Sequence, residues 1–162
     1  MATPTEPQSK RKLGEWVKQL MDGPEDPPLP TRPIPTASEA LRAFGVIAVV
    51  AVGLNLTALV IGRATGASMT ADIGVAVASI GPGAIIAATT FVMALGVLLW
   101  TVVGYHVSAF AYLWVPLGWG LALVSLAGVL GASDLGTGLT LSSMHMVTAA
   151  VTTLWLPRLL PR

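Results

Sequence analysis

The chain contains four long apolar segments that are almost free of charge, and this feature restricts its fold most. From residue 43 to residue 157 the charged side chains are those of Arg63, Asp72 and Asp134. A helix needs about 20 apolar residues to cross a bilayer core of about 30 Å. Soluble domains carry about 25% charged residues, whereas this chain of 162 residues carries 10%. The sequence therefore predicts an integral membrane protein.

The apolar segments predict four membrane-crossing helices. They lie at about residues 41–61, 84–104, 112–130 and 139–156, and the last two are the shortest. Short connections at 105–111 and 131–138 indicate that consecutive helices are antiparallel neighbours. The expected fold is an all-α, four-helix antiparallel membrane bundle formed by residues 39–162. Thr36 and Glu39 have the spacing of a capping box, which predicts the start of the first helix.

The connection between the first two segments, residues 62–83, is the longest within the bundle. Ile73, Val75 and Val77 alternate with small residues, as in a strand. Ile73, Val77 and Ile80 have a spacing that suits a helical turn equally well. The sequence leaves both structures open. Because lipid does not tolerate exposed irregular backbone, we expect this connection to cover the bundle, lie at the interface or re-enter the membrane.

The basic residues predict the orientation. Six of the nine Lys and Arg residues precede residue 43, and Arg158 and Arg162 lie near the other end of the chain. Since basic residues near spans stay on the cytoplasmic side, we expect a multi-pass membrane protein with both termini in the cytoplasm. Aromatic residues near the cytoplasmic helix ends predict an interfacial belt made of Trp100, Tyr105, Tyr112, Trp114, Trp119 and Trp155.

Residues 1–38 form a polar tail before the first span, and the prolines in 24–35 predict an extended linker. An amphipathic helix is predicted at about residues 10–22. Its apolar face and basic flank consist of Leu13, Trp16, Val17, Leu20 and Met21, with Lys10, Arg11 and Lys12. This face suits an anionic membrane surface or the groove of a protein partner, and disorder is the third alternative.

The chain has few groups for chemistry. It contains no cysteine, two histidines and eight carboxylates, which excludes disulfides and thiolate metal sites. Phosphate-binding loops, zinc-protease motifs and the nucleophile elbow are missing from the sequence. A net charge of +1 provides no field to recruit nucleic acid. We therefore expect no catalysis, no cofactor, no metal site and no nucleic-acid partner.

A predicted polar layer is the strongest candidate site. It contains one residue from each helix, at similar depths below the non-cytoplasmic surface: Asn55, Thr89, Ser125 and His145. The last segment also carries Ser142, Thr148 and Thr152 on the face of His145. Because polar side chains are costly against lipid, this face should point into the bundle. The layer is either inter-helix hydrogen bonding, which we favour, or a small-molecule or proton site.

Other polar residues have simpler interpretations. His106 is expected at the membrane interface, too far from His145 for the two rings to share a metal ion. The methionines on either side of His145 point away from it on a helix, which favours packing over metal binding. Asp72 and Asp134 are expected to be solvated loop carboxylates, with Asp134 forming a turn before the last helix.

Residues 40–162 resemble a family of small four-span membrane proteins of unknown function from high-GC bacteria. The likeness rests on residues 41–43 at the entry to an alanine- and valine-rich first span and on the long first connection. It rests also on residues 141–157, with Met144, His145 and Pro157. The resemblance implies this fold and the bacterial plasma membrane, and it implies no activity.

These observations lead to two functional hypotheses. The favoured one is a non-catalytic accessory, anchoring or scaffold subunit of a membrane complex, whose tail binds a larger partner. Small residues such as Gly96 and Gly104 in the second segment favour close helix contact and also suit a homo-oligomer. The alternative is a small transporter or sensor that uses the polar layer.

Overall fold

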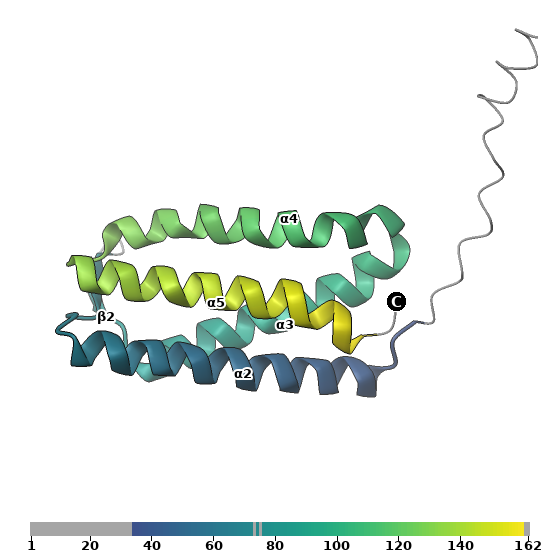
Figure 1. Ribbon diagram of the computed structural model, residues 1–162, viewed down its shortest axis with the longest axis horizontal. Helices are drawn as coiled ribbons and strands as arrows, with labels where there is room; N and C mark the ends of the chain where they lie inside the picture. Colours follow the sequence, from purple (N-terminus) through teal and green to yellow (C-terminus); the bar gives the residue numbers. More distant parts are fainter. Residues whose placement is uncertain (1–33, 73, 75, 161–162) are drawn as a thin grey trace, which may run out of the picture. The chain divides into compact units, whose positions relative to one another are not determined.

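The computed structural model describes residues 34–72, 74 and 76–160, which fall in one structural unit. Four long helices and a short hairpin form this unit (Figure 1). The predicted amphipathic helix at 10–22, with its eight candidate residues from Lys10 to Met21, lies outside the described residues. Residues 24–33 of the predicted linker lie outside them as well.

Four helices carry the apolar segments: α2 is Ala37–Ala64, α3 is Pro82–His106, α4 is Ser108–Ser125 and α5 is Leu135–Leu159. A short 3-10 helix, η1 at Leu126–Gly131, continues α4. All four segments are long and apolar enough to cross a membrane. Consecutive helices are antiparallel (Figure 1). The structure therefore has the predicted fold, an all-α four-helix membrane bundle.

The predicted capping box begins α2. The Thr36 hydroxyl accepts a hydrogen bond from the Glu39 backbone N–H at 3.3 Å, and the Glu39 carboxylate accepts one from the Thr36 backbone N–H at 2.7 Å. These two bonds satisfy N–H groups that have no partner within the first turn of a helix. The sequence pattern thus identified the helix start correctly.

The helices extend beyond the apolar segments that predicted them. The third and fourth crossing segments contain 23 and 25 residues, so neither is as short as the sequence indicated. The connection expected at residues 105–111 is reduced to Val107, which alone separates α3 from α4. The reason is that helical hydrogen bonds join backbone groups, so a helix continues through interfacial residues such as Tyr105 and His106.

A hairpin forms part of the connection between α2 and α3. Strand β1 (Thr70–Asp72) pairs antiparallel with β2 (Val77–Ser79), and Ala71 lies opposite Ala78. The strand interpretation is therefore correct at residues 77–79, and the helical one is wrong there. An isolated bridge joins Ala71 to Ala132 in the loop before α5. We call this end of the bundle the hairpin end, and the end with Ala37 and Leu159 the terminal end (Figure 1).

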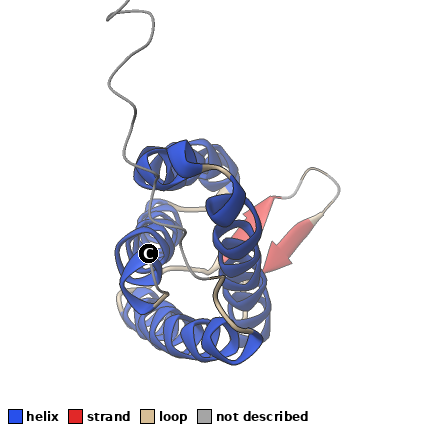
Figure 2. Cartoon of the chain, turned by 90° about the vertical axis from the view of Figure 1, so that its right-hand side faces the viewer, coloured by secondary structure: helices blue, strands red, loops and turns tan. Residues whose placement is uncertain are grey.

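Helix α5 contacts each of the other three helices. Helix α2 packs against α3 and α5, and α4 packs mainly against α5 (Figures 1 and 2). One glycine on each neighbour faces a threonine of α5 so closely that an added Cβ atom would collide with it. The pairs are Gly62 of α2 with Thr140, Gly96 of α3 with Thr152, and Gly118 of α4 with Thr153. Small residues at these contacts allow the helix backbones to approach, as in other membrane bundles.

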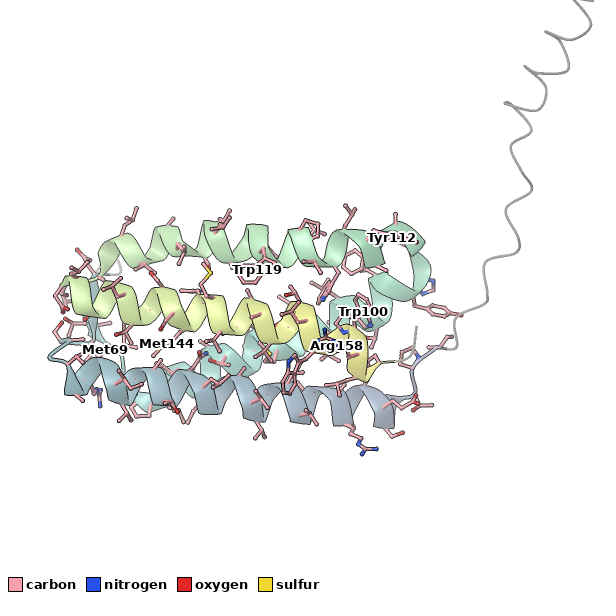
Figure 3. The ribbon with its side chains drawn as sticks, viewed as in Figure 1. Met69, Trp100, Tyr112, Trp119, Met144 and Arg158 are labelled. Atoms are coloured by element: carbon pink, nitrogen blue, oxygen red, sulfur yellow. The ribbon has the colours of Figure 1, made fainter. Side chains whose placement is uncertain are left out.

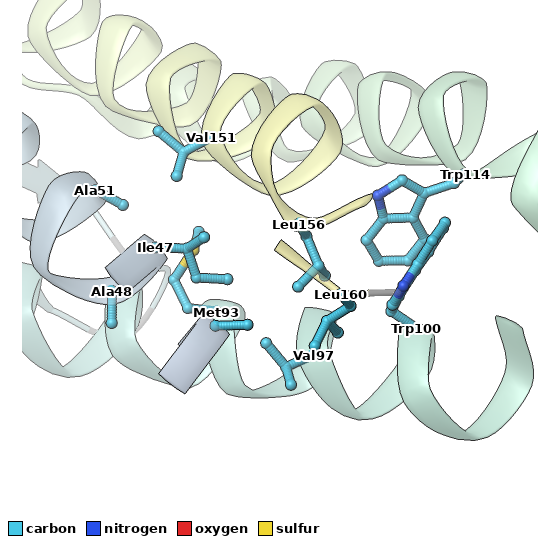
Figure 4. Packing of buried hydrophobic residues seen from close by; sticks show 11 residues of the cluster. Ile47, Ala48, Ala51, Met93, Val97, Trp100, Trp114, Val151, Leu156 and Leu160 are labelled. Carbon is cyan, nitrogen blue, oxygen red and sulfur yellow. The ribbon is translucent and has the colours of Figure 1, made fainter. Parts of the chain in front are cut away.

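Two groups of buried apolar residues fill the bundle. The terminal core lies toward the terminal end and includes Ala51, Met93, Val151 and Leu156 (Figure 4). The hairpin core lies toward the hairpin end and consists of Leu59, Ala67, Met69, Ile85 and Met144. Met69, which directly precedes β1, is 1% exposed and joins the hairpin to this core.

Two tryptophans expected at the interface lie inside the terminal core instead. Trp100 and Trp114 are buried, and their rings meet edge to face with centroids 5.2 Å apart. The Trp114 indole N–H also donates to the Thr152 carbonyl oxygen at 3.3 Å. Because the indoles find apolar contacts and an acceptor within the bundle, they do not need the interface. Tyr112 is 83% exposed and lies on the surface (Figure 3). Trp155 is 43% exposed and remains on the surface as well.

Candidate functional site

A single asparagine joins three helices near the middle of the bundle. The Nδ2 group of Asn55 on α2 donates to Thr89 Oγ1 on α3 and to Thr148 Oγ1 on α5, each at 3.0 Å. Asn55 is 2% exposed and Thr89 is 5% exposed. We call these three residues the Asn55 node.

The node separates the two apolar cores. On α2, Ala51 lies one turn before the asparagine and belongs to the terminal core, whereas Leu59 lies one turn after it and belongs to the hairpin core. On α3, Ile85 lies one turn before Thr89 and belongs to the hairpin core, whereas Met93 lies one turn after it and belongs to the terminal core. The node is therefore a small group of polar residues between two apolar cores.

One polar atom of the node has no partner. The carbonyl oxygen Oδ1 of Asn55 is buried and accepts no hydrogen bond from the residues that the structure describes. Buried side-chain oxygens in folded proteins are nearly always hydrogen-bonded, so an unpaired one needs an explanation. This oxygen is the most unusual feature of the candidate site.

His145 bonds to Ser125 on α4, and both side chains are half-buried. The distance from His145 Nδ1 to Ser125 Oγ is 3.0 Å. The Ser125 hydroxyl donates its one hydrogen to the Ala122 carbonyl oxygen at 2.6 Å, so His145 Nδ1–H must be the donor to Ser125. In the neutral ring, Nε2 then carries the free lone pair.

The predicted four-residue layer thus divides into two groups. Asn55 meets Thr89, and Ser125 meets His145, but no hydrogen bond joins the two groups within the described part of the chain. Thr148 completes the node, although the sequence placed it only on the polar face of α5. Its position three residues after His145 was the available signal. Whether the layer binds a small molecule or a proton stays a prediction.

A second polar cluster, which the sequence did not predict, lies at the hairpin end. The Asp134 carboxylate accepts hydrogen bonds from the Ser68 backbone N–H at 3.1 Å and hydroxyl at 2.5 Å. It also accepts bonds from the Thr137 backbone N–H and hydroxyl, each at 2.8 Å. Together these bonds hold the pKa of Asp134 well below its usual range, and the bond from the Ser68 hydroxyl has the largest effect.

The turn predicted at Asp134 is the N-cap of α5. Ser68 had no sequence signal, because its partner lies 66 residues away. The other loop carboxylate, Asp72, accepts a hydrogen bond from the Gly74 backbone N–H at 2.8 Å. The two aspartates therefore have separate partners.

The remaining sequence candidates lie apart from the node. His106 is exposed at the end of α3, beside the ring of Tyr105. Met144 packs in the hairpin core while its neighbour His145 bonds to Ser125, so these two side chains point to different places. Within the described residues, no three His, Asp or Glu side chains are grouped closely enough to hold a metal ion.

Comparison with known proteins gives a family but no activity. Searches of curated proteins and of solved structures returned no match. A family model described as "Family of unknown function (DUF6069)" matches residues 35–162. The matched region begins one residue before Thr36 of the capping box and contains every helix and strand of the bundle. The chain therefore belongs to this family of unknown function.

Proposed function

We propose that this membrane protein is a non-catalytic accessory, anchoring or scaffold subunit of a complex in the bacterial plasma membrane. In this proposal the bundle holds the chain in lipid, with both termini in the cytoplasm. The basic amphipathic segment at 10–22 binds a larger protein partner there, and the proline-rich segment acts as a spacer.

The pairing of polar side chains inside the bundle carries this proposal. Asn55 bonds to Thr89 and Thr148, and Ser125 bonds to His145. Contacts of this kind between membrane helices stabilise a fold by about 0.6 kcal/mol each on average. The bundle's polar groups thus support the fold, whereas most basic residues precede residue 43. The capacity for recognition is concentrated in the tail.

Native mass spectrometry of the full chain, released from its own membranes in mild detergent, tests the proposal. We expect a stoichiometric complex with a larger protein, and we expect deletion of residues 1–35 to abolish it. A full-length chain found only as a monomer contradicts the proposal. A complex that persists undiminished without residues 1–35 shows that the tail is not the binding element.

Point variants make the test sharper. Trp16 lies on the apolar face of the predicted helix, whereas Gln19 lies off that face. Trp16→Ala should reduce the amount of co-purified partner several-fold, and Gln19→Ala should leave it unchanged. Equal yields of folded bundle in the two variants would show that the difference arises from binding.

The unpaired Oδ1 atom of Asn55 supports a second candidate function, a small transporter or sensor that uses the polar layer. In that case Asn55→Leu or His145→Ala changes the cellular phenotype of the protein while the yield of folded protein stays the same. A loss of folded yield in both variants, with no separate change in phenotype, supports the structural role instead.

A further inference from the structure

The Asn55 node has more hydrogen-bonding capacity than its own side chains use. Oδ1 of Asn55 is buried and has no hydrogen-bond partner in the described part of the chain. Thr89 and Thr148 accept the amide hydrogens, but neither hydroxyl donates a hydrogen bond among the described residues. By contrast, Thr152 and Thr153 donate to carbonyl oxygens one turn earlier on α5, each at 2.7 Å. The node therefore holds one free acceptor and two free donors.

Rotation of the Asn55 amide does not remove this deficit. A half-turn exchanges Oδ1 with Nδ2, so that the two threonine hydroxyls donate to the carbonyl oxygen. The Nδ2 group then no longer donates to either threonine. In either orientation, one end of the buried amide lacks a partner within the node.

The surroundings of the node offer no replacement. The residues one turn away on α2 and α3 are apolar members of the two cores. The backbone N–H groups at this depth donate within their own helices, so they are not available to Oδ1. Within the described residues, Oδ1 therefore has no donor.

We propose that the Asn55 node binds one water molecule in the interior of the bundle. Buried waters make about three hydrogen bonds to polar groups that otherwise lack partners. The node provides that number, since the water can donate to Oδ1 and accept from the hydroxyls of Thr89 and Thr148. A cation fits less well, because the three oxygens are neutral and hard cations take about six or more oxygen ligands. This inference does not depend on the proposed function.

Asn55 is the single asparagine in the sequence, which permits a direct test. Full-length protein labelled with [¹⁵N]asparagine gives one side-chain NH₂ signal in a nanodisc or detergent micelle. We expect a rotating-frame Overhauser cross-peak from these hydrogens to water, whose sign distinguishes a bound water from hydrogen exchange. A folded wild-type protein whose Asn55 amide shows no such cross-peak overturns the proposal.

Matched variants locate the water. Replacing both hydroxyl groups of the node, in Thr89→Val with Thr148→Val, should abolish the cross-peak. Thr153→Val is the control, because Thr153 is buried on the same helix as Thr148 but donates to the Ala149 carbonyl oxygen. We expect this variant to keep the cross-peak. A cross-peak that keeps its full intensity after the loss of both node hydroxyls shows that the water is not bound at the node. If the double variant does not fold, the wild-type measurement alone tests the proposal.

Discussion

The carboxylate of Asp134 accepts hydrogen bonds from the backbone N–H and the hydroxyl of Ser68, which lies 66 residues earlier in the chain. The same carboxylate caps the first turn of α5. The next residue after Ser68 is Met69, whose φ of 52° is unusual for a residue with a side chain. Such backbone conformations persist where the surrounding structure holds them. One aspartate thus starts the last helix and fixes the approach to the hairpin.

Asp134→Ala should lower the midpoint of thermal unfolding, because it removes the α5 cap and both bonds to Ser68. Asp134→Asn should have a smaller effect, since its amide oxygen can still cap the helix. The measurement is circular dichroism during heating in one detergent. Asp72→Ala is the control, because Asp72 is exposed and bonds locally to Gly74. Equal losses from changes at 72 and 134 would contradict the bridging role.

The contribution of Asp134 to stability should depend on pH at the acid side. The hydrogen bonds from Ser68 and Thr137 lower its pKa in the folded state, while an unfolded aspartate has a pKa of about 3.9. The contribution is therefore fully present above that value and is lost as the pH falls toward the lower folded pKa. The difference in unfolding midpoint between wild type and Asp134→Asn should be constant from neutral to mildly acidic pH and narrow below about pH 4. If the difference in unfolding midpoint instead widened on acidification, the prediction that folding lowers the pKa of Asp134 would be wrong.

Gly62→Ala should destabilise the bundle by about 1–3 kcal/mol, the usual range for overpacking a close contact. The new Cβ atom would collide with the Thr140 side chain, which is itself held by a hydrogen bond to Gly136. Gly53→Ala is the matched control on α2, since nothing lies within 4 Å of its added Cβ atom. That change should be neutral or stabilising because alanine favours helices. Unfolding in a denaturing detergent compares the two, and similar stabilities would argue against close contact between α2 and α5.

Asn55 and Thr89 should be energetically coupled by about 0.6 kcal/mol, the average for hydrogen-bonded pairs between membrane helices. A double-mutant cycle with Asn55→Ala and Thr89→Val measures this coupling. The parallel cycle with Asn55→Ala and Thr153→Val should show none, because Thr153 donates to Ala149 instead. Strict additivity in both cycles would mean that the Asn55 amide does not hold α3 to α2.

The sequence predicted the features that depend on local pattern or on composition. The four spans follow from runs of apolar residues, and the start of α2 follows from the spacing of Thr36 and Glu39. The inward position of Asn55 follows from the cost of an amide in lipid. Helix ends were less accurate, because an apolar run marks the lipid-embedded part of a helix and not its backbone hydrogen bonds.

Only the tertiary structure decided which polar and aromatic side chains meet. The sequence alone predicted one layer of four residues, Asn55, Thr89, Ser125 and His145. In the structure Asn55 also bonds to Thr148, and His145 bonds to Ser125. It also places Trp100 against Trp114 and Ser68 against Asp134. The physical reason is that apolar content and capping spacing act within one segment, while these contacts depend on how each helix is rotated and shifted against its neighbours. Those rotations are set by packing between helices, such as Gly62 against Thr140, which no single segment contains.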